Sequence, residues 1–212
     1  MNMVIRVPLD LSRQQRERLC ALRSVFSGAC NELAGAVQQS GIWSRVALHH
    51  LHYRRLREQF PLLGSQMTCN AIYAVSRMAR LVYESPGSPY RSRRPGNEAL
   101  PRIRFAENSP VHFDRHTLSL VGSRLSLFTL DGRMHLDLAS DSARPQVLVR
   151  ARLSEIVLVE RRAGMFELLF VIARPADGPL PGAGPRGSRG AVHAADRTPP
   201  AMPPYLTVEE FE

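Results

Sequence analysis

The histidines of the segment HHLHYRR, which begins at residue 49, are the first candidates for chemistry. His49 and His52 are three residues apart and would share one face of a helix, as two metal ligands do. No Asp, Glu or Cys nearby completes a ligand set, so we predict no metal site and no cofactor. Because Cys20, Cys30 and Cys69 show no CxxC spacing, we expect neither a zinc site nor disulfide bonds, and a reducing cytosol.

Carboxylates are the second group of candidates. Phosphodiester cleavage by two metal ions needs several Asp or Glu side chains brought together, usually from strand ends. The acidic residues of the strand-rich region are Asp114, Asp131, Asp137, Asp141, Glu155, Glu160 and Glu167. The aspartates fall in or beside turns, where Asp is an ordinary residue, and the glutamates alternate with apolar residues as on a solvated sheet face. With no GxSxG elbow and no phosphate-binding glycine loop in the chain, we predict no catalytic residue and no enzyme activity.

Arginine-rich segments interleaved with aromatic residues are the strongest chemical signal. The chain has 28 basic residues, all arginine, against 19 acidic ones, and a net charge of +9. A guanidinium group binds phosphate with two hydrogen bonds and stacks on bases, so the surplus predicts a polyanionic partner, most simply a nucleic acid. A GC-rich coding bias also favours arginine over lysine, but it accounts less well for the surplus of positive charge. The predicted contact residues are Tyr90, Arg91, Arg93, Arg94, Arg102 and Arg104, with Arg54, Arg55 and Arg57 behind them.

Strands with one buried face are predicted across 109–172, where apolar and polar residues alternate. The breaks contain Gly122, the pair Asp131-Gly132, and Gly164, which are typical of hairpin turns. We therefore predict an antiparallel meander of five or six strands, preceded by a short strand near the N-terminus at 3–9.

Three helices are predicted between that first strand and the meander. The first runs from about residue 12 to about residue 39 and ends at Ser40-Gly41, with Gly28 as the place where it would break. The second spans 44–60 and the third 65–84, and the third is nearly apolar all round, which is typical of a buried helix. An apolar stripe is expected on the second helix at Val46, Leu48, Leu51, Leu56 and Phe60.

The order of strand, helices, Pro-rich basic connector, meander and closing hairpin resembles the N-terminal half of TnpB. TnpB is the OrfB-type RNA-guided nuclease of bacterial transposons and a relative of the type V CRISPR effectors. Its opening strand and first helix are similar to VIRVPLDLSRQQRERL and VFSGACNELA, with Asn31 at the family's asparagine position. Its next helix and Pro-Arg-Phe segment resemble SQMTCNAIYAVSRMARLVY and LPRIRF, with Ile103 where the family usually has Phe. Its paired strands and last hairpin are similar to LSLVGSRLSLFTLDGRMHLDL and SEIVLVERRAGMFELLFVI, so the resemblance covers about residues 3–174.

This resemblance implies an α+β fold. A wedge-like antiparallel β-barrel would be built from 1–10 and 101–174, with a three-helix, recognition-type insertion after the first strand at 11–84. A basic connector spans 85–100, and the Pro- and Gly-rich tail, 175–212, is predicted to be disordered. Because the N-terminus lacks an apolar signal-peptide core and no run is long enough to span a membrane, we expect a soluble cytoplasmic protein without a membrane partner.

The resemblance also implies binding of guide RNA and help in reading the DNA beside a target. The family's RuvC-like nuclease would follow Arg174, but no strand with a catalytic aspartate and no CxxC pair occurs there, and Asp177 and Asp196 lie among Pro and Gly. We therefore expect a nuclease-lacking protein that binds a structured guide-type RNA, with double-stranded DNA as a further partner. The alternatives are a trans-acting subunit that works with a separate nuclease or a full-length relative, a decayed fragment without independent activity, and a hydrolase with an unrecognised site.

Overall fold

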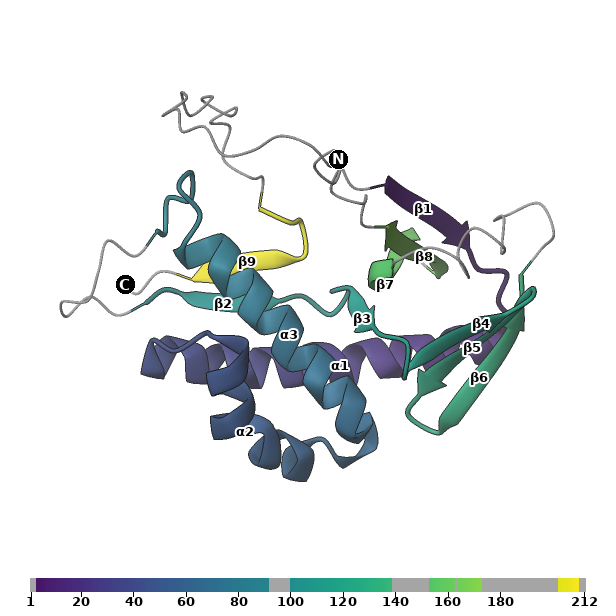
Figure 1. The fold of residues 1–212 in the computed structure, drawn as a ribbon, viewed down its shortest axis with the longest axis horizontal. Helices are drawn as coiled ribbons and strands as arrows, with labels where there is room; N and C mark the ends of the chain where they lie inside the picture. The colour runs from purple at the N-terminus through teal and green to yellow at the C-terminus, as the bar shows by residue number, and fades with distance from the viewer. Residues whose placement is uncertain (1–2, 92–99, 139–152, 163, 173–201, 210–212) are drawn as a thin grey trace, which may run out of the picture.

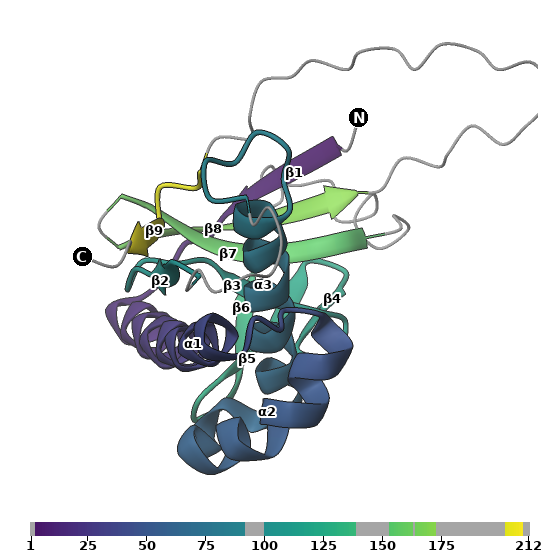
Figure 2. The same ribbon diagram turned by 90° about the vertical axis from the view of Figure 1, so that its left-hand side faces the viewer.

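The computed structural model describes residues 3–91, 100–138, 153–162, 164–172 and 202–209. Its helices are α1 (Arg13–Ser40), α2 (Arg45–Gln59) and α3 (Gly64–Tyr83), with a short 3-10 helix, η1 (Pro61–Leu63), before α3. Its strands are β1 (Met3–Pro8), β2 (Arg102–Phe105), β3 (Val111–Phe113), β4 (Leu118–Val121), β5 (Arg124–Thr129), β6 (Gly132–Asp137), β7 (Leu153–Arg162), β8 (Met165–Ile172) and β9 (Leu206–Glu209). Figures 1 and 2 show β1, β7 and β8 on one side of α1 and α3, and α2 on the opposite side.

The described strands form three antiparallel sheets, with the orders β1-β8-β7-β3, β4-β5-β6 and β2-β9. The predicted α+β fold with three helices after the first strand is therefore confirmed. The prediction of one continuous meander over 109–172 is wrong, because β3 pairs with β7 while β4, β5 and β6 pair only with one another. None of the three sheets closes on itself within the described residues, so the predicted barrel is not found.

Helix α1 begins and ends where its sequence predicts. The Ser12 hydroxyl accepts a hydrogen bond from the Gln15 amide at 3.2 Å, and the Gln15 side chain accepts one from the Ser12 amide at 2.9 Å. This reciprocal pair satisfies two amides that have no partner inside the helix. At the other end Gly41 has a φ of +66°, a left-handed conformation that glycine adopts without strain. The helix continues through Gly28 without a break.

One hydrophobic core runs from α1 and α3 to the inner faces of all three sheets. In β8 the residues Phe166, Leu168 and Phe170 are buried while their neighbours are not, as the period of two predicts. Leu19, Leu22 and other apolar residues of α1 lie in the same core. Burial of this shared apolar surface holds the sheets to the helices.

Three polar side chains of α1 fix one sheet each, and we call them the α1 anchors: Arg18, Arg23 and Asn31. Asn31 donates from Nδ2 to the Phe105 carbonyl at 2.9 Å and accepts from the Phe105 amide at 2.8 Å. It therefore takes both backbone groups of one β2 residue, as a neighbouring strand would. Arg23 forms an ion pair with Glu160 of β7 and lies over the Phe166 ring of β8.

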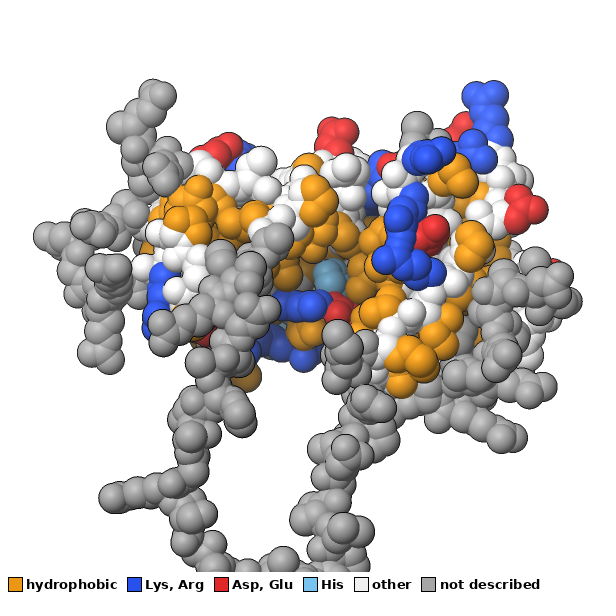
Figure 3. Space-filling view, turned by 90° about the horizontal axis from the view of Figure 1, so that it is seen from above, with side chains coloured by type: hydrophobic (Ala, Val, Ile, Leu, Met, Phe, Trp, Pro, Cys, Tyr) orange, Lys and Arg blue, Asp and Glu red, His pale blue; other side chains and the backbone are white. Residues whose placement is uncertain are grey.

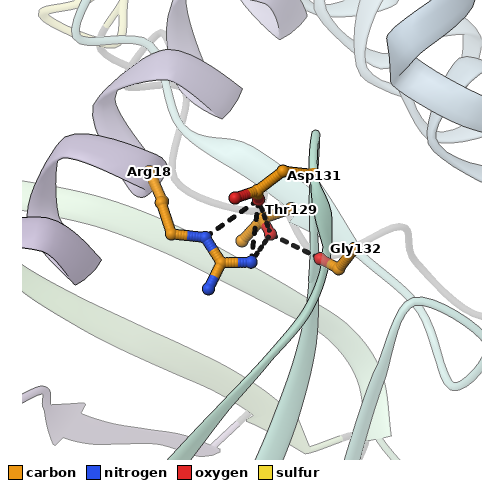
Figure 4. A network of polar contacts seen from close by, with 4 residues as sticks. All are labelled: Arg18, Thr129, Asp131 and Gly132. Atoms are coloured by element: carbon orange, nitrogen blue, oxygen red, sulfur yellow. Dashed lines mark hydrogen bonds and ion pairs between the residues drawn. The ribbon is translucent and has the colours of Figure 1, made fainter.

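The third anchor joins α1 to the turn between β5 and β6 (Figure 4). Arg18 Nε donates to Asp131 Oδ1 at 2.9 Å, and Arg18 Nη2 donates to the Thr129 hydroxyl at 2.7 Å. The Thr129 hydroxyl donates onward to the Gly132 carbonyl. Asp131-Gly132 is the pair predicted to make a hairpin turn, and Gly132 has the expected positive φ of +114°.

Helix α2 departs from its predicted apolar stripe. Only Leu48 and Leu56 are buried, whereas Val46 is 69% exposed and Leu51 is 57% exposed. The residues of the predicted stripe do not share one face of the helix. At about 100° per residue, for example, Val46 and Leu51 lie about 140° apart around the helix axis. The prediction for α3 is confirmed, since twelve of its residues are buried.

The predicted disorder of 175–212 is wrong for its last part. Leu206–Glu209 forms β9, which pairs antiparallel with β2. Leu206 is buried opposite Phe105, and Glu209 binds Arg104, so the return of apolar alternation after the Pro-rich run produces a strand. Residues 173–201 lie outside the described residues, as do 92–99 of the predicted connector. None of the described helices combines the length and apolar character needed to cross a membrane.

Replacing Asn31 by Ala should lower the free energy of unfolding by about 1–3 kcal/mol, because two backbone groups of Phe105 lose their partner. Urea unfolding followed by circular dichroism measures the loss. The control is Gln39→Ala on the exposed side of α1, which should change stability by less than about 0.5 kcal/mol. Equal effects of the two substitutions would contradict an anchoring role for Asn31.

Candidate functional site

Seven of the nine predicted contact residues are described, and they lie in three parts of the structure. Arg54, Arg55 and Arg57 are on α2, and Arg102 and Arg104 are on β2. Arg91 is exposed at the end of the segment that follows α3, whereas Tyr90 is half-buried against the core. Arg93 and Arg94 lie outside the described residues, so their part of the prediction is not tested.

Helix α2 presents the densest positive charge among the described helices. Its sequence, RVALHHLHYRRLREQ, contains four arginines and three histidines against one glutamate. The rings of His49 and Tyr53 stack at 4.7 Å, with 21° between their planes. Since only Leu48 and Leu56 are buried, most of the helix faces outward. We call this face the α2 surface and define it by Arg45, His49, His50, Tyr53, Arg54, Arg55 and Arg57.

Several of the predicted arginines are paired with carboxylates. Arg54 lies 3.3 Å from Glu58 on the same helix, and Arg55 lies 2.5 Å from Glu32 of α1. Arg104 lies 2.9 Å from Glu209, the pair that links β2 to β9. Exposed ion pairs of this kind contribute at most about 1 kcal/mol each, so an incoming phosphate can displace the carboxylate.

Two of the predicted groups meet over one turn of α1. Arg55 of α2 binds Glu32, and the Arg102 guanidinium of β2 lies against Gly35, with Nη2 at 3.2 Å from where a Cβ would stand. Positions 32 and 35 are neighbours on a helix surface. The absence of a side chain at Gly35 lets Arg102 lie flat on the helix, a contribution that the sequence pattern alone did not indicate.

A hollow of about 730 Å³ opens between α3 and the β1-β8-β7-β3 sheet. Its floor is the outer, apolar face of the sheet, and its α3 wall carries Arg77 and Arg80. Figure 3 shows this side of the molecule, with hydrophobic side chains around a histidine and with basic and acidic side chains beside it. No sequence motif predicted the site, because its residues come from elements far apart in the chain.

Glu155 of β7 was expected on a solvated face, and this expectation is wrong. The Glu155 side chain is 10% exposed. Its Oε1 forms an ion pair with Arg77 and lies 2.8 Å from Nδ1 of His112. Glu160 is similarly enclosed by Arg23 and the Gly164 amide. The two glutamates lie on opposite faces of β7, and a helix covers each of them: α1 covers Glu160 through Arg23, and α3 covers Glu155 through Arg77. Alternation along the strand does not show which faces are covered by helices.

The charge of Glu155 is maintained by its neighbours. Burial by itself would raise the pKa of this carboxyl, but the His112 contact and the Arg77 charge outweigh it, so the pKa lies below its ordinary value of 4.5. His112 is in turn held by the edge of the Tyr73 ring, with 5.9 Å between ring centroids. The group can accept hydrogen bonds and pair with cations at neutral pH.

Metal binding finds no support in the part of the chain that the structure describes, where no group of three or more His, Cys, Asp or Glu side chains could hold an ion. The ring of His49 stacks on that of Tyr53, and His52 lies on the side of α2 that faces α1, beside Glu32 and Arg55.

In comparisons with known proteins, no family model matches the chain, and no curated protein matches it either. The resemblance to the TnpB family therefore stays a prediction.

Folding stability should fall as the pH drops below about 4.5, because Glu155 has a lower pKa in the folded state than in the unfolded chain. The contribution of Glu155 to folding stability is fully present when the pH is above the ordinary pKa of the carboxyl group. It is lost as the pH falls through the lower pKa of the folded state. Urea midpoints measured between about pH 6 and about pH 3 should decline less for Glu155→Gln than for the wild type. The urea midpoint of Glu107→Gln, a change at an exposed residue, should decline as much as that of the wild type. An identical decline for all three proteins would contradict the lowered pKa of Glu155.

Proposed function

We propose that the protein binds structured RNA through the α2 surface and the arginines of β2, and that it does so without cutting the RNA. The observation that carries the proposal is the composition of α2. Leu48 and Leu56 are its only buried residues, Tyr53 is partly buried against the core, and the remaining positions are rich in arginine and histidine. A helix that exposes this much positive charge fits a phosphate backbone.

The dimensions of the α2 surface suit a folded RNA. Fifteen residues make a helix of about 22 Å, which is long enough to follow several phosphates. The stacked rings of His49 and Tyr53 supply a face for an unpaired base beside the arginines. Arg45, at the start of the helix, lies over the Tyr73 ring of α3 and extends the charge toward that helix.

A second contact set lies on β2. Arg102 and Arg104 project from one strand, and Arg102 shares the Glu32–Gly35 turn of α1 with Arg55. The two sets would therefore contact one RNA rather than two. The attraction between the arginines and the RNA phosphates would supply affinity, and the shape of the folded RNA would supply selectivity, as expected for a guide-type RNA. Double-stranded DNA would be a further partner.

A trans-acting interaction subunit is the second candidate, and exposed apolar residues favour it. Val46 and Leu51 of α2 and Leu62 of η1 are each more than half exposed. Such residues suit a protein partner, for which a separate nuclease or a full-length relative is the natural choice. A stoichiometric protein that stays bound after RNase treatment would favour this candidate over RNA binding alone.

RNA binding should weaken steeply with salt. If roughly six arginines contact phosphates, the logarithm of affinity should fall with the logarithm of salt concentration at a slope near −4 to −5. The triple substitution Arg54→Gln, Arg55→Gln and Arg57→Gln should make that slope less steep by about 2 to 3. Filter binding or fluorescence anisotropy, with the RNA that copurifies with the expressed protein, measures both slopes.

The matched control removes the same charge elsewhere. Arg115, Arg124 and Arg162 are exposed arginines on the strands and their connections, and changing all three to Gln should leave the slope within about 0.5 of the wild type. If the control triple weakened binding as much as the α2 triple, binding would depend on net charge rather than on the α2 surface. Absence of any copurifying nucleic acid would contradict the proposed function itself.

A further inference from the structure

The hollow between α3 and the four-stranded sheet has the size and lining of a binding site. Its volume of about 730 Å³ falls within the range of sites for small organic groups. Its floor is apolar and includes Val157, Val159 and Leu169. These residues lie on the side of the sheet opposite the shared core, where an apolar face is open to a flat ligand.

A line of cations and aromatic rings joins this hollow to the α2 surface. Arg45 lies 5.3 Å from the centre of the Tyr73 ring, and Tyr73, Arg77 and Arg80 follow at positions i, i+4 and i+7 of α3. Residues at these spacings form one stripe along a helix. Arg77 and Arg80 line the hollow, so a phosphate backbone that leaves the α2 surface along this stripe reaches it.

A largely buried carboxylate, that of Glu155, lines the hollow. The shortest contacts of its two neighbours, Arg77 and His112, are both at Oε1, so Oε2 is the oxygen better placed to accept from a ligand. His112, which is 6% exposed, also lines the hollow and keeps its 2.8 Å contact from Nδ1 to Glu155 Oε1. A buried carboxylate is stabilised by each further hydrogen-bond donor, which a ligand in the hollow can supply.

The chemistry required of the ligand follows from these groups. It needs a flat body that tolerates an apolar wall, an N–H donor for Glu155 Oε2, and a neighbouring negative charge for Arg80. An amino-bearing nucleobase with its phosphate meets all three conditions. Carboxylates accept from the N4 amino group of cytosine, whereas uracil offers an oxygen at the same position.

We propose that the hollow receives an unstacked base of the bound RNA and that Glu155 selects a base with an exocyclic amino group, so that cytosine binds in preference to uracil. This inference rests on the proposed RNA binding. It adds a base-specific pocket to a surface that otherwise contacts phosphate.

The test compares oligocytidylate and oligouridylate of equal length, about a dozen nucleotides, which lies within the site sizes of single-strand-binding folds. The wild type should bind oligocytidylate roughly tenfold more tightly. Val157→Phe, which fills the floor beside Glu155, should abolish this difference and leave the affinity for oligouridylate and its salt slope unchanged. Val121→Phe adds the same ring at an exposed position on β4 and should keep the preference.

Two further arms make the result decisive. Leu169→Phe fills the same floor from β8 and replaces Val157→Phe if that variant unfolds at a lower temperature than the wild type. Titrations with CMP, UMP and ribose 5-phosphate, followed by NMR, distinguish a base of RNA from a free nucleotide. Binding of CMP by a protein that binds neither oligonucleotide would overturn RNA as the source of the base.

A different result would overturn only the base pocket. If oligocytidylate and oligouridylate bound equally well with a steep salt slope, the proposed function would stand and the pocket assignment would fall. A cytosine preference that survived both Phe substitutions in folded protein would likewise place base selection elsewhere. Absence of binding by every oligonucleotide and nucleotide would overturn the base pocket, and the proposed function would fall as well only if the copurifying RNA were not bound either.

Discussion

The position of helix α1 against three separate sheets is the constraint on which the rest of the structure depends. Hydrophobic burial brings the sheets and the helix together, but burial is not directional and does not fix how each sheet is turned. Arg18, Arg23 and Asn31 supply the directional contacts, one to each sheet. Because these residues lie along a single rigid helix, the three sheets share one frame of reference although they share no hydrogen bonds with one another among the described strands.

The candidate surfaces depend on that frame. Arg102 lies against Gly35 on the same strand, β2, that Asn31, one turn earlier on α1, holds through the backbone of Phe105. The hollow exists because α3 stands away from the outer face of the sheet that Arg23 positions. The polar contacts of α1 therefore govern both the arginine surface and the pocket, although none of these three side chains lies in either.

Local features of the fold were predictable from the sequence, and pairings between distant segments were not. The ends of α1 and the burial of α3 follow from periodicity and capping, and the turn glycines Gly122, Gly132 and Gly164 all have positive φ. The partner of β3 and the existence of β9 depend on residues far apart in the chain, which no local pattern specifies. The same distinction applies to the sites: the α2 arginines were found from one segment, whereas Arg77, His112 and Glu155 come from three.

The pairing of β2 with β9 has a consequence for the order of folding during synthesis. Arg104 and Glu209 are 105 residues apart, so at ordinary rates of translation β2 exists for roughly 5–20 s before β9 leaves the ribosome. One edge of β2 is satisfied early, because Asn31 is already present and takes the backbone of Phe105. The opposite edge stays unpaired during that interval and is open to nascent-chain chaperones or to a strand from another polypeptide.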